Sequence, residues 1–290
     1  MAWPGWTEAA AKHRGKIAGA GIALVAGVAL LFLAIGGRPA APLHDRLTVD
    51  LPPAANDRIY ASPAARGRPI VVIDPGHGGR DPGATSVSGQ IQEKYLTLVL
   101  ARQLRDALVS RGRVRVAMTR DDDRYLTLDD RAAVARRLDA AEFVSIHIDS
   151  APNPLARGAS VYSLSDVASD EEAARLAAVE NGSSGAAEQG NAVQTLLADL
   201  AMRSQMSASA DLAARLVNKA SGTIELRPNP HRFAAFYVLR RARTPAILFE
   251  AGYLSNADDE LLLRSPEQRS KMVLALAQAI ETDVAARSRH

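Results

Sequence analysis

The sequence predicts an α/β protein: a single catalytic domain on a mainly parallel mixed sheet, flanked by helices on both faces. Short apolar runs of β type alternate with longer segments of helical period over residues 69–290. Such an order needs crossover connections, which place helices on both faces of a mostly parallel sheet. A chain of 290 residues, 47% of them hydrophobic, is also long enough to form the core of one medium-sized domain.

The first strand and the first helix of this alternation carry the clearest signals. The apolar run VVI at 71–73 is ended by DPG at 74–76, so we expect a buried strand over 70–74. The segment 93–111 keeps apolar residues on one face at helical spacing and is expected to form an amphipathic helix. Its apolar positions are Leu96, Val99, Leu100, Leu104 and Leu108.

The remaining elements continue the alternation toward the C-terminus. We expect strands at 113–118, 142–148, 158–163, 235–239 and 246–250. We expect helices at 127–139, 192–220 and about 266–286. In such an open sheet, ligands bind at the edge where the parallel strands have their carboxyl ends.

The N-terminal segment predicts export. Basic residues at 12–16 precede an unbroken apolar run at 17–37, near the length of a membrane span. Residues 1–37 are therefore expected to be a signal peptide or an N-terminal membrane anchor, and the basic end stays in the cytoplasm in either case. Residues 38–68 are rich in Pro and Ala and are expected to form an extended linker, with one short strand near 47–51.

Composition limits the classes of partner. The formal net charge is +3 with a pI near 9.3, which suits an anionic polymer without specifying one. No recognition motif or dense basic cluster supports binding of nucleic acid. The chain has no cysteine, which excludes disulfides and thiolate zinc sites.

A histidine set among glycines directly follows the first strand, in VVIDPGHGGRDPGA at 71–84. His77 is therefore expected on a tight turn at the carboxyl edge of the sheet, where open α/β folds bind ligands. Glycines on both sides let the chain bend sharply and let a ligand approach closely. The competing interpretation is a polar turn residue, so the function of His77 depends on whether it has partners.

Three residues at other element ends are candidate partners. His147 ends the apolar run in EFVSIHIDS at 142–150 and is expected at the same sheet edge as His77. Glu93 opens the predicted helix 93–111, where a first-turn carboxylate is also favoured by the helix dipole alone. Glu250 closes an apolar strand, and a carboxylate there is costly to bury unless it is bonded or has a task.

These four side chains match the requirements of a hydrolytic metal site. Two neutral imidazoles and a carboxylate leave one position of a tetrahedral Zn²⁺ open for water. A further carboxylate beside that water supplies a general base. The spacing differs from the helical H-E-x-x-H of zincin-type proteases, which the sequence therefore does not indicate.

The four motifs, in this order, resemble the zinc-dependent N-acetylmuramoyl-L-alanine amidases of the type 3 family, the periplasmic murein amidases of cell division. The resemblance covers about residues 69–285. It implies that His77, Glu93 and His147 bind Zn²⁺ and that Glu250 is the catalytic glutamate. Ile148 stands where such enzymes often carry a small residue; this leaves the ligand intact and changes the adjacent wall.

The resemblance also implies a substrate, a location and partners. The bond cleaved would be the amide between N-acetylmuramic acid and L-alanine in peptidoglycan, during cell-wall remodelling and daughter-cell separation. The enzyme would be periplasmic, anchored in the inner membrane if the N-terminal segment is not cleaved. It would act as a monomer with a protein activator at the division site.

The segment 166–191 interrupts the α/β alternation. It begins with helix-start signals, including Glu171 and Glu172, and ends in a Gly/Ser loop at 181–191. One interpretation is an ordinary surface helix. The resemblance implies another, in which an inserted helix covers the zinc until an activator displaces it. We then expect Glu180 to be the inhibitory zinc ligand, with Glu171 and Glu172 as weaker candidates.

Two further residues and two other functions complete the hypotheses. His231 and Arg232 precede the predicted strand 235–239 and are candidate substrate-binding residues, although His231 fits a simple turn equally well. The alternatives to an amidase are a metal-dependent peptidase or deacetylase of the cell wall and an inactive amidase-like regulator. Retention of His77, Glu93, His147 and Glu250 argues against the inactive form.

Overall fold

The computed structural model describes residues 57–182 and 192–288. The chain divides into two units, residues 1–50 and 51–290, and the described fold belongs to the second. The apolar segment predicted to be a signal peptide or anchor lies outside the described residues. Within the described ranges, no helix is both long and apolar enough to cross a membrane.

The end of the predicted linker belongs to the fold. Two residues of it, Ile59–Tyr60, form strand β1, which pairs with the third strand, and Pro63–Ala65 form a 3₁₀ turn, η1. Residues 59–65 of the predicted linker 38–68 thus contain regular structure. The predicted strand near 47–51 lies outside the described residues.

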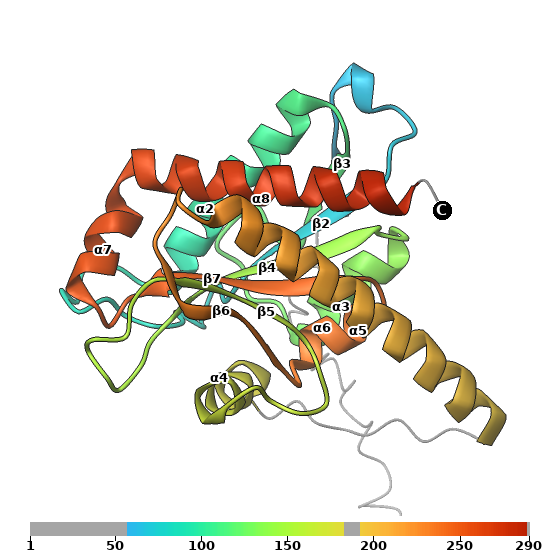
Figure 1. The fold of residues 1–290 in the computed structure, drawn as a ribbon. Helices are drawn as coiled ribbons and strands as arrows, with labels where there is room; N and C mark the ends of the chain where they lie inside the picture. Colours follow the sequence, from blue (N-terminus) through green and yellow to red (C-terminus); the bar gives the residue numbers. More distant parts are fainter. Residues whose placement is uncertain (1–56, 183–191, 289–290) are drawn as a thin grey trace, which may run out of the picture. The chain divides into compact units, whose positions relative to one another are not determined.

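The described strands form one sheet, in the order β1-β3-β2-β4-β7-β5-β6 (Figure 1). Its longer members are β2 (Ile70–Pro75), β3 (Arg115–Met118), β4 (Glu142–Asp149), β5 (Ala159–Leu164), β6 (Leu226–Ala234) and β7 (Ala246–Tyr253). The central strands β3, β2, β4 and β7 run parallel, and β5 is antiparallel to β7. This arrangement confirms the predicted mainly parallel mixed sheet.

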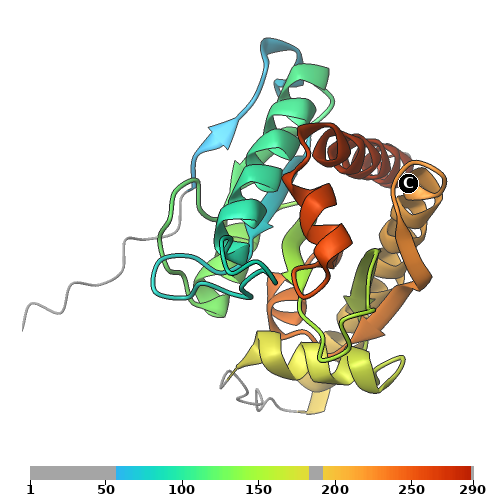
Figure 2. The same ribbon diagram turned by 90° about the vertical axis from the view of Figure 1, so that its left-hand side faces the viewer.

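Helices cover both faces of this sheet, as the sequence predicts. They are α2 (Glu93–Arg111), α3 (Leu128–Arg137), α4 (Glu171–Asn181), α5 (Ala192–Ala220), α6 (Tyr237–Ala242), α7 (Ala257–Arg264) and α8 (Pro266–Arg287). Figures 1 and 2 agree that α4 lies on the side of the sheet opposite to α8.

The two faces of the sheet bury two separate apolar cores. On strand β2, Val71 and Ile73 pack with residues of α2, α5 and α8, while Ile70 and Val72 pack with residues of α3, α4 and α6. This is the period-two alternation of a strand that is covered on both faces. A strand buried in this way has fixed register, and so the residues at its carboxyl end have fixed positions.

The predicted strand 235–239 is wrong. A helix, α6, begins at Tyr237, and the strand β6 precedes it. The apolar residues Phe236, Val238, Leu239 and Ala242 are all buried and follow helical rather than alternating spacing. Over five residues the two patterns are difficult to separate.

The strand β6 escapes the sequence analysis because it contains two prolines. Proline cannot donate to a ladder and usually indicates a turn. Here β6 is an edge strand that pairs only with β5, so Pro228 and Pro230 are tolerated in it. Its formation moves His231 and Arg232 from a predicted loop into the sheet.

Candidate metal centre

Adjacent parallel strands bring the predicted residues together at one sheet edge. Pro75 of β2 pairs with Ile146 of β4, and His147 of β4 pairs with Glu250 of β7. His77 follows the end of β2 by two residues. The convergence expected from the strand order is therefore present.

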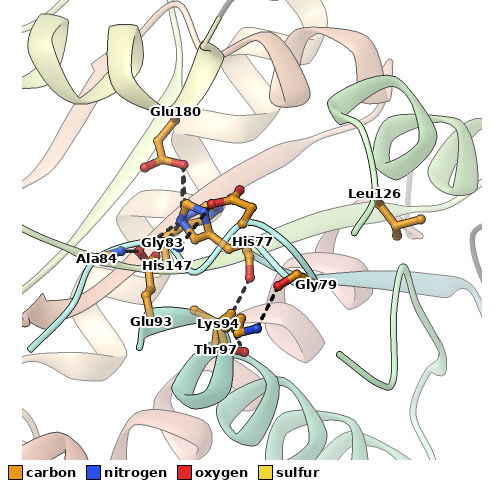
Figure 3. A network of polar contacts seen from close by, with 12 residues as sticks. His77, Gly79, Gly83, Ala84, Glu93, Lys94, Thr97, Leu126, His147 and Glu180 are labelled. Atoms are coloured by element: carbon orange, nitrogen blue, oxygen red, sulfur yellow. Dashed lines mark hydrogen bonds and ion pairs between the residues drawn. The ribbon is translucent and has the colours of Figure 1, made fainter. Parts of the chain in front are cut away.

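The two imidazoles and Glu93 lie within contact distance. His77 Nε2 is 3.0 Å from Glu93 Oε2, and His147 Nδ1 is 3.2 Å from Glu93 Oε1. The two rings meet edge to face, with their centroids 5.0 Å apart. Three side chains, from the turn after β2, from α2 and from β4, thus point at one small volume, as Figure 3 shows.

Close backbone approach around this volume depends on two glycines. A Cβ on Gly76 would lie 2.4 Å from the His147 ring. A Cβ on Gly83 would lie 2.5 Å from Glu93 Oε2 and 2.6 Å from the His77 ring. Any other residue at these positions would displace the candidate ligands.

The turn that carries His77 is held by two buried arginines. His77 itself has a positive φ of 58°, which is uncommon outside glycine. Arg131 donates to the carbonyls of Pro75 and His77, each at 2.6 Å, and to the buried carboxylate of Asp74 at 2.9 Å. Arg120 donates to the carbonyl of Pro75 at 3.0 Å and to that of Gly76 at 2.6 Å. These hydrogen bonds from Arg120 and Arg131 therefore fix the backbone of the turn.

His77 and Glu93 are also oriented by hydrogen bonds to residues outside the candidate metal centre. His77 Nδ1 lies 2.9 Å from Asp81 Oδ2, so the other ring nitrogen faces the site. Glu93 accepts backbone hydrogen bonds from Ala84 and Ile148, each at 2.9 Å, one on each oxygen. Such outer contacts are what fixes ligands in protein metal sites.

The ring nitrogens are suited to a cation. Among the described residues, His77 Nε2 and His147 Nδ1 are buried and make no hydrogen bond. Burial lowers the pKa of His77, but the carboxylates of Glu93, Asp81 and Glu180 together outweigh burial and raise that pKa to about 11. The site thus stabilises positive charge strongly. Neutral imidazole nitrogens and carboxylate oxygens are also the donor set that Zn²⁺ takes.

Glu250 is fully buried within β7, three residues before that strand ends at Tyr253, and neither of its oxygens has a hydrogen-bond partner among the described residues. Burial, reinforced by the nearby Asp149 carboxylate, raises its pKa well above the usual value. An unpartnered buried carboxylate of this kind is costly to keep and is typical of a functional group.

Glu180 completes the cluster from above. It extends from the last turn of α4, and its Oε2 lies 3.2 Å from His147 Nδ1 and 3.8 Å from His77 Nε2 (Figure 3). His77, His147 and Glu180 form a group whose geometry would hold a metal ion. The other two candidate inhibitory ligands of segment 166–191 do not reach the cluster. Glu172 accepts hydrogen bonds from Arg227 instead, and Glu171 is exposed.

A cavity of about 750 Å³ adjoins the cluster. His77, Glu93 and His147 line it from the sheet, and Arg175 and Glu180 line it from α4. The helix is held down by the buried side chains of Leu176 and Ala177. The expected helix of the 166–191 segment is therefore present and lies over the metal centre.

The candidate substrate residues His231 and Arg232 lie away from the cluster. His231 Nε2 lies 3.0 Å from Ser163 Oγ of the neighbouring strand. Arg232 forms an ion pair with Asp170, the N-cap residue of α4. Neither residue lines the cavity beside the metal cluster.

Sequence reasoning missed the residues that support the site. Asp81 lies four residues after His77, in a motif whose histidine and glycines alone indicate a site. Arg120 and Arg131 act on a turn more than 40 residues away, and only the tertiary structure shows this.

Comparison with known proteins identifies the family. The family model for N-acetylmuramoyl-L-alanine amidases matches residues 71–282. AmiA of Escherichia coli K12 is 33% identical over 230 residues, which cover 76% of this chain and 79% of that protein. AmiC of Neisseria meningitidis serogroup B is 35% identical over 219 residues, covering 74% of this chain and 52% of the relative. The chain therefore spans about half the length of that second relative.

Solved structures show the same fold. The catalytic domain of CwlV, an amidase of Bacillus (Paenibacillus) polymyxa, is 26% identical with a TM-score of 0.54, covering 73% of this chain and 96% of that one. AmiC2 of Nostoc punctiforme is 28% identical with a TM-score of 0.54, covering 77% and 99%.

The structure is an α/β domain with a cluster of imidazoles and carboxylates at one edge of its sheet. This combination is typical of metal-dependent hydrolases. The chain belongs to the N-acetylmuramoyl-L-alanine amidase family. This confirms the predicted family, fold and enzyme class.

The glycine contacts give a test of the site. Gly83→Ala should lower zinc content well below one ion per chain, because its Cβ would push Glu93 and His77 apart. The matched control is Gly89→Ala, since Gly89 has a similar positive φ of 72° but nothing within 4 Å of the added atom. Both variants should lose about 1 kcal/mol of stability from backbone strain. Equal zinc content in the two variants would contradict the assigned ligands.

Proposed function

We propose that this amidase works with a zinc ion held by His77, Glu93 and His147, and with Glu250 as its general base. The main support is the pair of buried imidazole nitrogens that face Glu93 without hydrogen-bond partners. The donor set fits zinc, whose neighbouring ligands in a tetrahedral site lie about 3.3 Å apart, near the observed contacts.

The chain's residues divide the chemistry between them. A bound zinc ion supplies a water of lowered pKa and polarises the scissile carbonyl. Glu250 would take a proton from the attacking water as its oxygen adds to the lactyl carbonyl of N-acetylmuramic acid. The same carboxyl then passes the proton to the leaving nitrogen of L-alanine as the C–N bond breaks. Burial supports this role, because a raised pKa lets Glu250 hold the proton between the two steps.

Substitution of Glu250 separates metal binding from proton transfer. Glu250→Gln should keep zinc while hydrolysis of sacculi falls by orders of magnitude, and His77→Ala should lose both. The control is Glu142→Gln, another fully buried glutamate with a raised pKa, at the start of β4, which should keep both. Zinc content and released peptide are measured by mass spectrometry. Near-normal turnover of Glu250→Gln would show that the general base is a different group.

We also propose that α4 inhibits the enzyme. Glu180 contacts both imidazoles and so competes for the position that water or substrate needs. A free-energy difference of about 3 kcal/mol between covered and open states holds activity near one per cent. Displacement of α4 would be the work of the activator protein expected from the family resemblance.

Loss of the inhibitory carboxylate should raise basal activity. Glu180→Gln and a deletion of residues 166–191 should each hydrolyse sacculi several-fold faster than the parent and depend less on an activator. Glu171→Gln is the control, because Glu171 is exposed on the same helix. If a folded, zinc-loaded Glu180→Gln variant is no faster than the parent, α4 is not inhibitory.

The N-terminal segment supports a periplasmic location. Residues 1–37 would act as a signal peptide or as an anchor in the inner membrane, with residues from 38 onward forming a tether and then the catalytic domain, which acts as a monomer on peptidoglycan. A reporter enzyme that is active only outside the cytoplasm, fused after His290, should be active with residues 1–37 present and inactive without them. Equal activity of both fusions would overturn export by this segment.

A further inference from the structure

A second cavity, of about 570 Å³, lies beneath the N-terminal half of α4. Three arginines line it, Arg157, Arg175 and Arg227, together with Glu172 and residues of the segment after β4. Arg175 lines this cavity and also the one beside the metal cluster. The two cavities therefore adjoin under the same helix.

The carboxylate of Glu172 on α4 lines this second cavity and occupies a well-formed anion site. Glu172 accepts two parallel hydrogen bonds from Arg227, at 2.9 and 2.8 Å. It also accepts from the hydroxyl of Tyr253 at 2.9 Å and lies 3.2 Å from Arg232 Nη1. Bidentate pairing with a guanidinium is the most specific way in which proteins recognise a carboxylate.

The donors and the acceptor come from different parts of the fold. Arg227 and Arg232 belong to β6, and Tyr253 ends β7 and is fully buried, so all three are fixed by the sheet. The hydrogen bond from Arg227 lowers the pKa of Glu172 to about 2, although burial opposes it. If α4 leaves, two guanidiniums and a phenol remain with no carboxylate from that helix to bind.

We propose that Arg227, Arg232 and Tyr253 form a receptor for a free carboxylate of the peptide stem, and that Glu172 occupies it in the covered state. This rests on the proposed inhibition by α4. The helix then carries two substrate-like carboxylates, Glu180 at the metal centre and Glu172 at the receptor.

The spacing of the two glutamates selects the substrate group. Glu172 and Glu180 are eight residues apart on α4, which is about 12 Å along a helix axis. An extended peptide covers about 12 Å in three to four residues. The receptor is therefore suited to a carboxylate on roughly the third residue of the stem, counted from the scissile amide.

The competing explanation is that the cluster only fastens α4 to the sheet. Glu172→Gln and Arg227→Gln distinguish the two explanations, because a fastening role makes the variants alike. Under the receptor proposal they act in opposite directions. Glu172→Gln removes an internal competitor and lowers KM for a substrate with a free carboxylate, while Arg227→Gln raises it.

The experiment uses the zinc-loaded enzyme and two soluble substrates, an N-acetylmuramoyl tripeptide with a free terminal carboxylate and the same compound amidated there. Arg227→Gln should raise KM for the free acid about tenfold and leave KM for the amide nearly unchanged. Arg240→Gln, which loses an exposed ion pair with Asp166, is the matched control and should leave the ratio of the two KM values at the parent value.

The outcomes separate the two proposals. Equal KM for both substrates in the parent, unchanged by Arg227→Gln, would overturn the receptor while leaving the amidase intact. Failure of both the parent and the Glu180→Gln variant, each loaded with zinc, to cleave either compound or sacculi would instead overturn the proposed metal chemistry. If Arg227→Gln does not fold, Tyr253→Phe removes one donor alone and should still raise KM for the free acid selectively; no change would count against the receptor.

Discussion

Two buried guanidinium groups hold the backbone turn on which the metal centre depends. Arg120 and Arg131 are nearly inaccessible, and burying a charge is strongly unfavourable unless hydrogen bonds compensate. For Arg131 the compensation includes the carboxylate of Asp74; the contacts of Arg120 are made chiefly with carbonyls. Burial accordingly lowers the pKa of Arg120 to about 10. Most of these carbonyls belong to the turn at 75–77, and one belongs to Lys94 of α2. Because the buried arginines must keep these hydrogen bonds, they hold the His77 imidazole in one position relative to the sheet, α2 and α3.

A second constraint is the excess of negative charge above that turn. Glu93, Glu180 and Glu250 are all withdrawn from water around two imidazoles. Burial raises the pKa of Glu180, and the nearby carboxylate of Glu93 adds to that rise. Carboxylates so close together need a cation, which explains why burial does not keep His77 neutral. A divalent metal ion would also balance this negative charge. The proposed zinc binding and the proposed inhibitory contact of Glu180 therefore both depend on the same cluster of carboxylates around the two imidazoles.

The sequence predicts what is local and misses what is distant. His77, His147 and Glu250 follow from apolar runs that end at a polar residue, and α/β topology brings such ends together. Arg227 and Arg232 could not be placed, because Pro228 and Pro230 conceal an edge strand whose existence depends on β5. The same holds for Arg120 and Arg131, whose acceptors on the turn at 75–77 lie more than 40 residues away. The segment 235–239 leads into helix α6 instead of forming the expected strand, because five apolar residues fit a strand as well as a helix.

Competition between a helix and a substrate for one surface has a thermodynamic consequence. Besides its buried apolar residues, α4 is held by polar contacts with Arg227, Arg232 and the imidazoles, and these are the groups that we propose a peptide stem would use. A ligand that binds only the open state shifts the population toward it in proportion to its differential affinity. Substrate and activator would therefore reinforce each other, because each removes part of what the other must displace. In such an enzyme α4 would stay over the metal centre where peptide stems are sparse. It would be displaced most readily where an activator holds the enzyme close to dense peptidoglycan.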